Sequence, residues 1–311
     1  MTSPPVKPEM KFWSITHFDH EKQAQELERL AEEHGLRGFI DVSEEVYHKS
    51  PGISNTGLSW IAMSPAHYEV YRDDPPPRTP ALILGAAIHR AILEPERFEN
   101  MYAGEPKFDK RTKVGQAAYK EWLENEGNGK EALKIEDMET CLRIRDAASR
   151  NIVLRNMLDY TQGKAEQSMY WYDGFIEEDV QGNVLCRARC DFVRIGDDII
   201  CDVKSTLDAS AESFGRTVHN RELRYYKQAA FYSDGYKEIT GRTPQFVFIA
   251  VEKQKPYGVG IYVLEPDAVT IGRSEYRSEL LTYMRCKKKN EWPCYPATVQ
   301  TLFMPSWFLK P

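Results

Sequence analysis

The feature that most constrains the fold is a change in hydrophobic periodicity near residue 160. Before it, apolar residues recur every three or four positions, which is typical of amphipathic helices. Segments with this pattern are Ser54–Arg72, Thr79–Glu94, Gly115–Glu124 and Ile135–Leu158. Pro65 lies inside the first of them. Because proline removes a backbone donor and clashes with the preceding turn, we expect two helices there.

Beyond residue 160 the pattern becomes that of strands joined by turns at 181–183 (Gln-Gly-Asn) and 196–197 (Gly-Asp). The expected strands are Glu166–Tyr172, Val184–Arg194 and Asp198–Ser205. A helix is then expected, followed by two strands and a long helix, over Glu222–Thr240, Phe246–Glu252, Gly258–Leu264 and Asp267–Lys288. This order predicts an α/β (α+β) chain with a central mixed β-sheet flanked by helices, rather than a doubly wound parallel sheet.

One domain is expected after a short N-terminal extension. Residues 1–38 are predicted to form a Pro-rich leader (1–18) and a charged helical segment, which could be a surface helix or an oligomer arm. Residues 39–311 are predicted to form a single domain. It would comprise a helical N-terminal part (39–160), a sheet core (161–290) and a tail (291–311).

Composition excludes some classes of protein. The chain has 311 residues and a formal net charge of −6, which argues against a simple basic DNA-coating protein, although a basic groove can exist in an acidic protein. Its six cysteines form no CxxC pair, and no apolar run is long enough to span a bilayer. With no signal peptide at its start, we expect a soluble protein of a reducing compartment, with free thiols and no membrane partner.

The segment from Arg187 to Lys204 carries the chemistry. Strand alternation places Cys186, Ala188 and Cys190 on one face and Arg187, Arg189 and Asp191 on the other. In the next strand, Asp202 and Lys204 face away from Cys201 and Val203. If the two strands form a hairpin, two carboxylates and one ammonium group converge.

Such a carboxylate pair suits Mg²⁺ or Mn²⁺, both of which prefer oxygen ligands. A neighbouring lysine could orient or deprotonate an attacking water. Taken alone, Asp-x-Lys is a weak motif, because exposed strand faces often alternate charges.

Three further places in the sequence could complete the site. Tyr225, Gln228 and Tyr232 share one face of the helix that follows the hairpin, where they could contact a phosphate or simply pack on the sheet. His89, on an otherwise apolar helix, could ligate metal as neutral imidazole or be a hydrogen-bonded core histidine. Glu166 could be a further carboxylate ligand or an ordinary strand-end residue.

The ensemble resembles the PD-(D/E)XK nucleases, in the order Gly-x-x-x-His, Glu, Asp, Asp-x-Lys, Gln-x-x-x-Tyr. Within them it is most similar to the RecE-type exonuclease VIII family, from about residue 39 to the C-terminus. The segments that carry this likeness are Ile53-Ser-Asn-Thr-Gly-Leu58, Ser64-Pro-Ala-His-Tyr68, Leu84–Pro95, Tyr226–Gly235, Trp292-Pro-Cys-Tyr295 and Pro305-Ser-Trp307.

The resemblance implies a restriction-endonuclease-like core with an N-terminal helical extension. It implies a Mg²⁺-dependent exodeoxyribonuclease, with Mn²⁺ as a substitute, that degrades linear duplex DNA 5′ to 3′ and produces 3′ single-stranded tails for recombination by strand annealing. The implied partners are DNA ends, a RecT-like single-strand annealing protein and further copies of the chain in a ring-shaped homo-oligomer. The implied location is the cytoplasm of a bacterium or a phage-infected host.

The resemblance also implies a role for each candidate residue. Asp191, Asp202 and the carbonyl of Val203 would hold Mg²⁺, with His89 and Glu166 as candidate further ligands. Lys204 would activate or orient water, while Gln228 and Tyr225, with Tyr232 as a lesser candidate, would position the phosphate. Arg187 and Arg189 would contact the DNA backbone.

Two departures from the family pattern bear on these expectations. The proline of the motif's name is absent, since Cys201 precedes Asp202 within a strand, and Cys294 stands where the family usually has glycine. Some relatives carry an iron–sulfur cluster on one early and three late cysteines. Only Cys286 and Cys294 are late here, so no cluster is expected.

Two alternatives stay open at the level of sequence. The first is a structure-specific or sequence-specific endonuclease on the same fold, which digestion of linear but not closed circular DNA would exclude. The second is a catalytically silent DNA-binding subunit, against which the retained Asp191, Asp202, Lys204 and Gln228 argue.

Overall fold

The computed structural model describes residues 12–14, 20–177 and 179–304. Among these residues, seven strands form one sheet in the order β1-β2-β5-β6-β7-β8-β9, and two more form a small separate sheet. The strands of the large sheet are β1 (Phe12–Ser14), β2 (Gly38–Asp41), β5 (Lys164–Ile176), β6 (Gln181–Arg194), β7 (Ile199–Thr206), β8 (Gln245–Glu252) and β9 (Val259–Val263). Those of the small sheet are β3 (Tyr102–Glu105) and β4 (Glu131–Lys134).

The large sheet is mixed. β5, β6 and β7 form an antiparallel meander, β7 and β8 run parallel, and β8 and β9 are antiparallel. On the other side, β2 is antiparallel to β5 and parallel to β1. Since a parallel pair needs a crossover, the chain between β7 and β8 passes through two helices on one face of the sheet.

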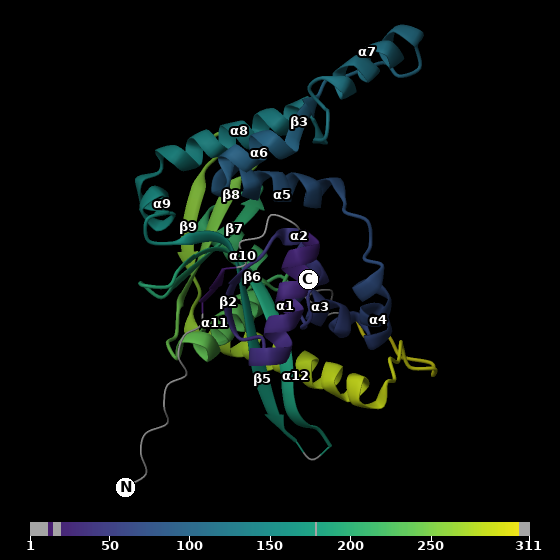
Figure 1. Ribbon diagram of the computed structural model, residues 1–311, viewed down its shortest axis with the longest axis vertical. Helices are drawn as coiled ribbons and strands as arrows, with labels where there is room; N and C mark the ends of the chain where they lie inside the picture. Colours follow the sequence, from purple (N-terminus) through teal and green to yellow (C-terminus); the bar gives the residue numbers. More distant parts are fainter. Residues whose placement is uncertain (1–11, 15–19, 178, 305–311) are drawn as a thin grey trace.

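Helices cover both faces of this sheet (Figure 1). The helices before the meander are α1 (His20–His34), α2 (Glu44–Lys49), α3 (Asn55–Met63), α4 (Pro65–Asp73), α5 (Pro80–Leu93), α6 (Pro95–Met101), α7 (Lys113–Glu124), α8 (Ile135–Arg150) and α9 (Ile152–Met157). Those after it are α10 (Ala211–Val218), α11 (Tyr225–Thr240) and α12 (Pro266–Lys289). Helices α5, α6 and α8 lie on one side, α11 and α12 lie on the other, and α7 extends away from the body (Figure 1).

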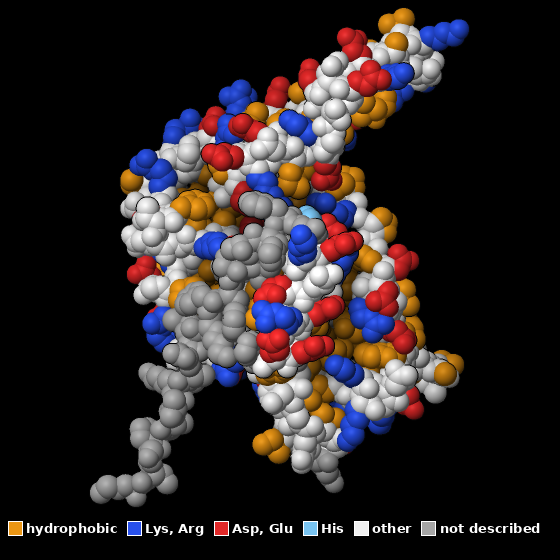
Figure 2. Space-filling view, in the orientation of Figure 1, with side chains coloured by type: hydrophobic (Ala, Val, Ile, Leu, Met, Phe, Trp, Pro, Cys, Tyr) orange, Lys and Arg blue, Asp and Glu red, His pale blue; other side chains and the backbone are white. Residues whose placement is uncertain are grey.

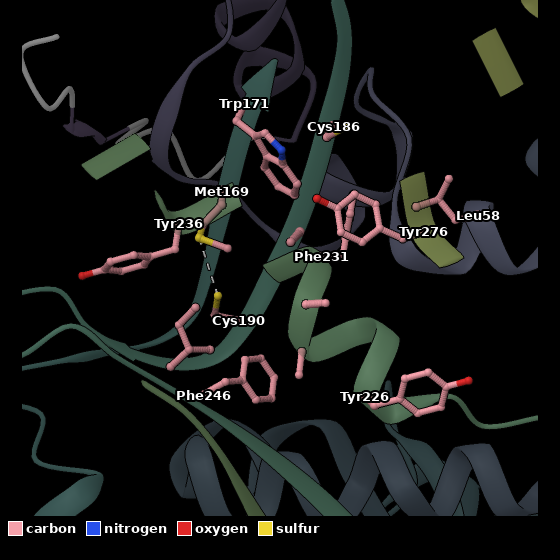
Figure 3. Close-up of a cluster of buried hydrophobic side chains, with 14 of the residues drawn as sticks. Leu58, Met169, Trp171, Cys186, Cys190, Tyr226, Phe231, Tyr236, Phe246 and Tyr276 are labelled. Atoms are coloured by element: carbon pink, nitrogen blue, oxygen red, sulfur yellow. Dashed lines mark hydrogen bonds between the residues drawn. The ribbon is translucent and has the colours of Figure 1, made fainter. Parts of the chain in front are cut away.

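Strand alternation produces the two cores. On β8, Phe246, Phe248 and Ala250 pack in a core with α11 and α12, while Val247, Ile249 and Val251 pack in a second core with α5 and α8. Figure 3 shows the first core, where Trp171 of β5 lies beside Phe231 of α11 and the Cys190 thiol lies 3.8 Å from the Met169 sulfur. Alternate apolar residues of the strands therefore face opposite sides of one sheet, and the apolar faces of the helices pack against them.

The predicted fold class is confirmed, with a central mixed sheet flanked by helices. The break at Pro65 separates α3 from α4, as expected. The predicted helix over 135–158 is two helices, because the side chain of Asn151 accepts the Leu154 N–H and starts a new helix. Helix α11 begins only at Tyr225, because the Asn220 side chain accepts the N–H groups of residues 222 and 223 and holds that segment in a turn.

The turn predicted at 181–183 is wrong, because these residues belong to β6 and pair with β5 up to Gln181↔Ile176. The hairpin turns before them, where the Glu177 N–H donates to the Val180 carbonyl. The predicted turn at Gly196-Asp197 is present between β6 and β7.

The N-terminal extension is partly described. Its charged segment forms α1, whose Leu27 and Leu30 pack in a third cluster with Ile40, Val46 and Tyr170, so it is a surface helix docked on the body. Within the expected leader, residues 12–14 form β1, and the rest of residues 1–18 lies outside the described residues. Residues 305–311 of the expected tail also lie outside them.

Figure 2 shows acidic and basic side chains interspersed on the face that it views, including α7. Within the described ranges, no helix has the length and apolar character needed to cross a bilayer.

Candidate active site

The candidate site lies where two neighbouring strands separate. The β6–β7 ladder ends at the pair Phe192↔Cys201, and the next two residues in register are Asp191 and Asp202. Instead of a backbone bond, Asp191 Oδ2 accepts the Val203 N–H at 2.7 Å. The side chain of Asp191 therefore takes over the hydrogen bond that the ladder would have made, and both acids lie at the fork.

Asp202 faces helix α11. Its Oδ1 accepts a hydrogen bond from Gln228 Nε2 at 2.7 Å, and its Oδ2 lies 2.6 Å from Lys204 Nζ. The Lys204 ammonium also lies over the Tyr225 ring, 4.6 Å from its centroid. Strand alternation sends Asp202 and Lys204 to one face, while Cys201 and Val203 pack in the core on the other. The first turn of α11 supplies both Tyr225 and Gln228.

Asp191 faces helix α5 and strand β5. His89 Nδ1 lies 3.1 Å from Asp191 Oδ2. Glu166 lies between the β5–β6 pairs Ala165↔Phe192 and Gln167↔Cys190, which puts it opposite Asp191. Its backbone is in the left-handed region at φ 54°, and its carboxylate accepts from Arg189 Nε at 2.8 Å. A strained position in a long strand often marks a functional site.

Burial and neighbouring charges shift the pKa values of Asp202 and Asp191 in opposite directions. Burial raises the pKa of Asp202 to about 6, with a further contribution from Asp191, although Lys204 opposes the shift. Burial also favours neutral Asp191, but His89 and Lys204 outweigh it and hold its pKa below the usual value. Two acids at one fork are thus driven apart in acidity, as happens when carboxylates share a site.

The basic groups respond to the same acids. Burial would lower the pKa of Lys204, but the charges of Asp202 and Asp191 outweigh it and raise this pKa. Burial would also lower the pKa of His89, but the charge of Asp191 outweighs it and raises that pKa as well. Burial, helped by Asp191, raises the pKa of Glu166, with Arg189 opposing. Lys204 is therefore an ammonium group that balances the charge of the acids.

The remaining predicted residues have protein partners. Tyr232 packs against Phe246, and its phenol pKa is raised well above the usual value by burial and by neighbours that include Asp202. Arg187 donates to the carbonyls of Tyr47 and His48 at the end of α2, at 2.5 and 3.1 Å. Arg189 donates to Glu166, the Val42 carbonyl and Ser168. DNA contact by these three residues stays a prediction.

The donor set fits a divalent cation that prefers oxygen. Asp202 Oδ2 is buried and, despite its close ammonium neighbour, accepts no hydrogen bond of normal geometry. Within the described ranges no three His, Cys, Asp or Glu side chains form a preassembled metal cluster. Mg²⁺ often binds through one or two carboxylates and retains several waters, so Asp191, Asp202 and the Val203 carbonyl are sufficient candidates.

Two charged residues that support the site, Arg90 and Lys227, were not predicted from the sequence. Arg90, next to His89, is buried and binds Glu44 and Glu94 at 2.5 Å each. Lys227, next to Gln228, is fully buried and binds Glu279 of α12. The available signal was a charged residue among apolar neighbours on a helix, because such a residue needs a partner once it is buried.

The comparisons with known proteins agree with this fold. The chain belongs to the family of PDDEXK-like domains of unknown function named DUF3799, whose model matches residues 58–302. This class of domain has the nuclease fold that the sheet and the fork define. No functionally curated protein matches the chain in sequence.

Two solved structures are similar. A crystal structure of a candidate exonuclease from Eubacterium rectale has a TM-score of 0.54 and 14% identity, over 87% of this chain and 98% of that chain. At this identity the likeness shows the fold alone. The crystal structure of SSO0001 has a TM-score of 0.36 and 10% identity, over 84% and 83% of the two chains, which is too distant to support an argument.

Proposed function

We propose that this protein is a metal-dependent nuclease that hydrolyses phosphodiester bonds of DNA. The observation that carries the proposal is the fork of β6 and β7, where Asp191 and Asp202 lie with Lys204 2.6 Å from Asp202. The PDDEXK-like fold supports the same reaction class. A silent DNA-binding subunit would have no need for a buried acid pair with an ammonium group beside it.

Each residue of the fork has a distinct proposed role. Mg²⁺ or Mn²⁺ held by Asp191, Asp202 and the Val203 carbonyl would lower the pKa of a bound water and offset phosphate charge. Lys204, 2.6 Å from Asp202, would orient or activate the attacking water and stabilise negative charge. Gln228 holds one oxygen of Asp202, which leaves the other facing Lys204. Tyr225 covers the ammonium, and His89 orients Asp191.

The finer proposal is an exonuclease that works 5′ to 3′ on duplex DNA ends and produces 3′ tails for strand annealing. The resemblance of the sequence motifs to the RecE-type family supports it. The same resemblance supports a RecT-like annealing partner, a ring-shaped assembly and a cytoplasmic location. A ring would reconcile the net charge of −6 with DNA binding, because only the channel needs to be basic.

The test is digestion of linear duplex DNA, labelled at one end, in the presence of Mg²⁺. We expect the 5′-ended strand to be shortened from each end while covalently closed circular DNA stays intact. Cleavage of the circle would favour the endonuclease alternative. Gel analysis of both strands over time distinguishes the two.

Matched acid variants test the assignment of the site. We expect Asp202→Ala to abolish digestion, whereas Asp197→Asn, in the exposed turn of the same hairpin, should digest at the wild-type rate. Equal activity of wild type and Asp202→Ala, or no activity in either, would refute the nuclease assignment.

A further inference from the structure

Lys227, the residue before Gln228, makes its contacts away from the fork of β6 and β7. Lys227 lies in the first turn of α11, and its side chain is fully buried. Its Nζ lies 2.6 Å from Glu279 Oε2 on α12 and 3.3 Å from Ser59 Oγ on α3. A buried ammonium group is strongly unfavourable without a partner, so Lys227 ties α11 to two other helices.

Glu279 holds the residue before the helix as well. Its Oε1 accepts from Arg224 Nη1 at 2.5 Å. Arg224 occupies the N-cap position in the left-handed conformation, at φ 46° and ψ 47°, and makes no side-chain capping bond. Residues other than glycine disfavour this conformation, so a contact from outside the helix is needed to maintain it. One carboxylate therefore fixes both Arg224 and Lys227, which flank the start of α11.

Helix α12 is a close-packed support for this contact. At Gly272 a Cβ atom would lie 2.5 Å from the Tyr226 carbonyl oxygen and 2.9 Å from the Lys227 Cα. The two helix backbones thus touch at the same turn that carries Tyr225 and Gln228. Because this close contact prevents α12 from sliding along α11, a shift of Glu279 would also shift the start of α11.

An ion pair at this depth is a poor source of stability. Replacing a buried pair with apolar residues of similar size is often neutral or stabilising, since desolvation offsets the attraction. What the pair supplies here is geometry, because the Lys227 ammonium contacts Glu279 of α12 and Ser59 of α3 at once and so fixes α11 against both helices. The residues that this arrangement orients are those at the fork of β6 and β7.

We propose that Lys227 and Glu279 are positioning residues, which set the start of α11 so that Gln228 reaches Asp202 and Tyr225 lies under Lys204. The catalytic consequence rests on the proposed nuclease function, whereas the geometric one does not. Lys227→Met is the sharpest variant, because it keeps most of the side-chain volume and leaves Glu279 paired with Arg224. Lys227→Arg, which retains the charge, is the conservative partner variant.

The experiment has three readouts: the NMR signals of the Gln228 side-chain amide, assigned with Gln228→Ala, then kcat and KM for linear DNA, then the urea midpoint. For Lys227→Met we expect amide signals like those of a water-exposed glutamine. We expect kcat to fall on the order of 10²-fold with KM unchanged, as for a small misplacement near the reacting groups. The urea midpoint should fall, because Glu279 Oε2 loses its cationic partner, and Lys227→Arg should recover part of kcat.

Leu280→Ala is the control for a merely structural effect, since Leu280 is fully buried beside Glu279 on α12. It should lower the urea midpoint while the Gln228 signals and kcat per folded molecule stay as in wild type. The proposal is overturned if Lys227→Met keeps the wild-type Gln228 signals, or if Leu280→Ala alters signals and kcat as strongly as Lys227→Met. Should the wild type lack nuclease activity, the amide signals alone decide.

Discussion

At the scale of single residues, the fork of β6 and β7 shows how two acids acquire different properties from their surroundings. Asp191 receives a backbone N–H and faces His89, whereas Asp202 is nearly inaccessible and depends on Lys204 and Gln228. The first pKa is lowered and the second is raised to about 6. Pairs of titratable groups with pKa values driven apart are typical of sites that handle protons and charge.

Lys204 provides the first prediction. Lys204→Met should lower kcat about 10²-fold or more, because the ammonium that balances Asp202 and developing phosphate charge is lost. Lys204→Arg should retain more activity, since it keeps the positive charge. Steady-state digestion of labelled duplex measures both, and a Lys204→Met variant as active as Lys204→Arg would contradict a charge-based role.

Sequence patterns were sufficient to predict that Asp202, Lys204, Tyr225 and Gln228 lie together. Alternation with period two places Asp202 and Lys204 on one face, and helical spacing puts Tyr225 and Gln228 together. The expectation that Asp191 shares that face is wrong, because the alternation of β6 breaks at Asp191, which faces α5 on the other side of the sheet from α11. The partners of Arg187 could not be predicted, because its contacts are carbonyls at the end of α2, far away in sequence. Lys227 was missed for the same reason, since Glu279 is 52 residues distant.

At the scale of elements, partly buried ion pairs hold the helices that carry site residues. Glu44 of α2 binds Arg90 of α5 at 2.5 Å, next to His89. Long elements such as α11, α12 and β8 were predictable from their periodicity. Short ones such as α2 and β2 were not, because six or four residues contain too little of a repeat to be recognised.

Glu44 gives a prediction about pH. The His48 ring, with its Nε2 3.8 Å from Glu44 Oε1, and the Arg90 charge lower the pKa of Glu44 from 4.5 to about 2, although burial opposes the shift. A carboxylate with a depressed folded-state pKa stabilises the protein above its unfolded-state value, and this stabilisation is lost as pH falls through the folded value. Glu44→Gln should therefore be less stable than wild type near neutral pH.

The difference between Glu44→Gln and wild type should shrink as the pH falls from about 4.5 towards 2. Urea unfolding followed at several pH values measures it. Because Glu44 is partly exposed, added salt should also reduce the difference. A difference that grows as the pH falls would contradict the contact.

At the scale of the whole molecule, the N-terminal extension is part of the folded body. Helix α1 and strand β2 share a buried cluster with Tyr170 of β5, which belongs to the central meander. Sequence could not distinguish an attached helix from an oligomer arm, because a charged amphipathic pattern fits both. The cluster decides in favour of attachment.

Leu27→Ala tests this attachment. Leu27 is 1% exposed, so its truncation should lower the free energy of unfolding by about 2–5 kcal/mol. Val114→Ala on the projecting helix α7 is the control, since Val114 is 80% exposed and its truncation should have little effect. Equal urea midpoints for wild type and Leu27→Ala would show that α1 is not held by this cluster.

The central claim is that the acids at the fork of β6 and β7 hold a divalent cation, and a calorimetric titration with Mn²⁺ tests it most directly. We predict saturable binding to wild type, loss of that binding in Asp202→Asn, and unchanged binding in Asp197→Asn. Wild-type protein that takes up no Mn²⁺, or an Asp202→Asn variant that binds it as tightly, would contradict the account.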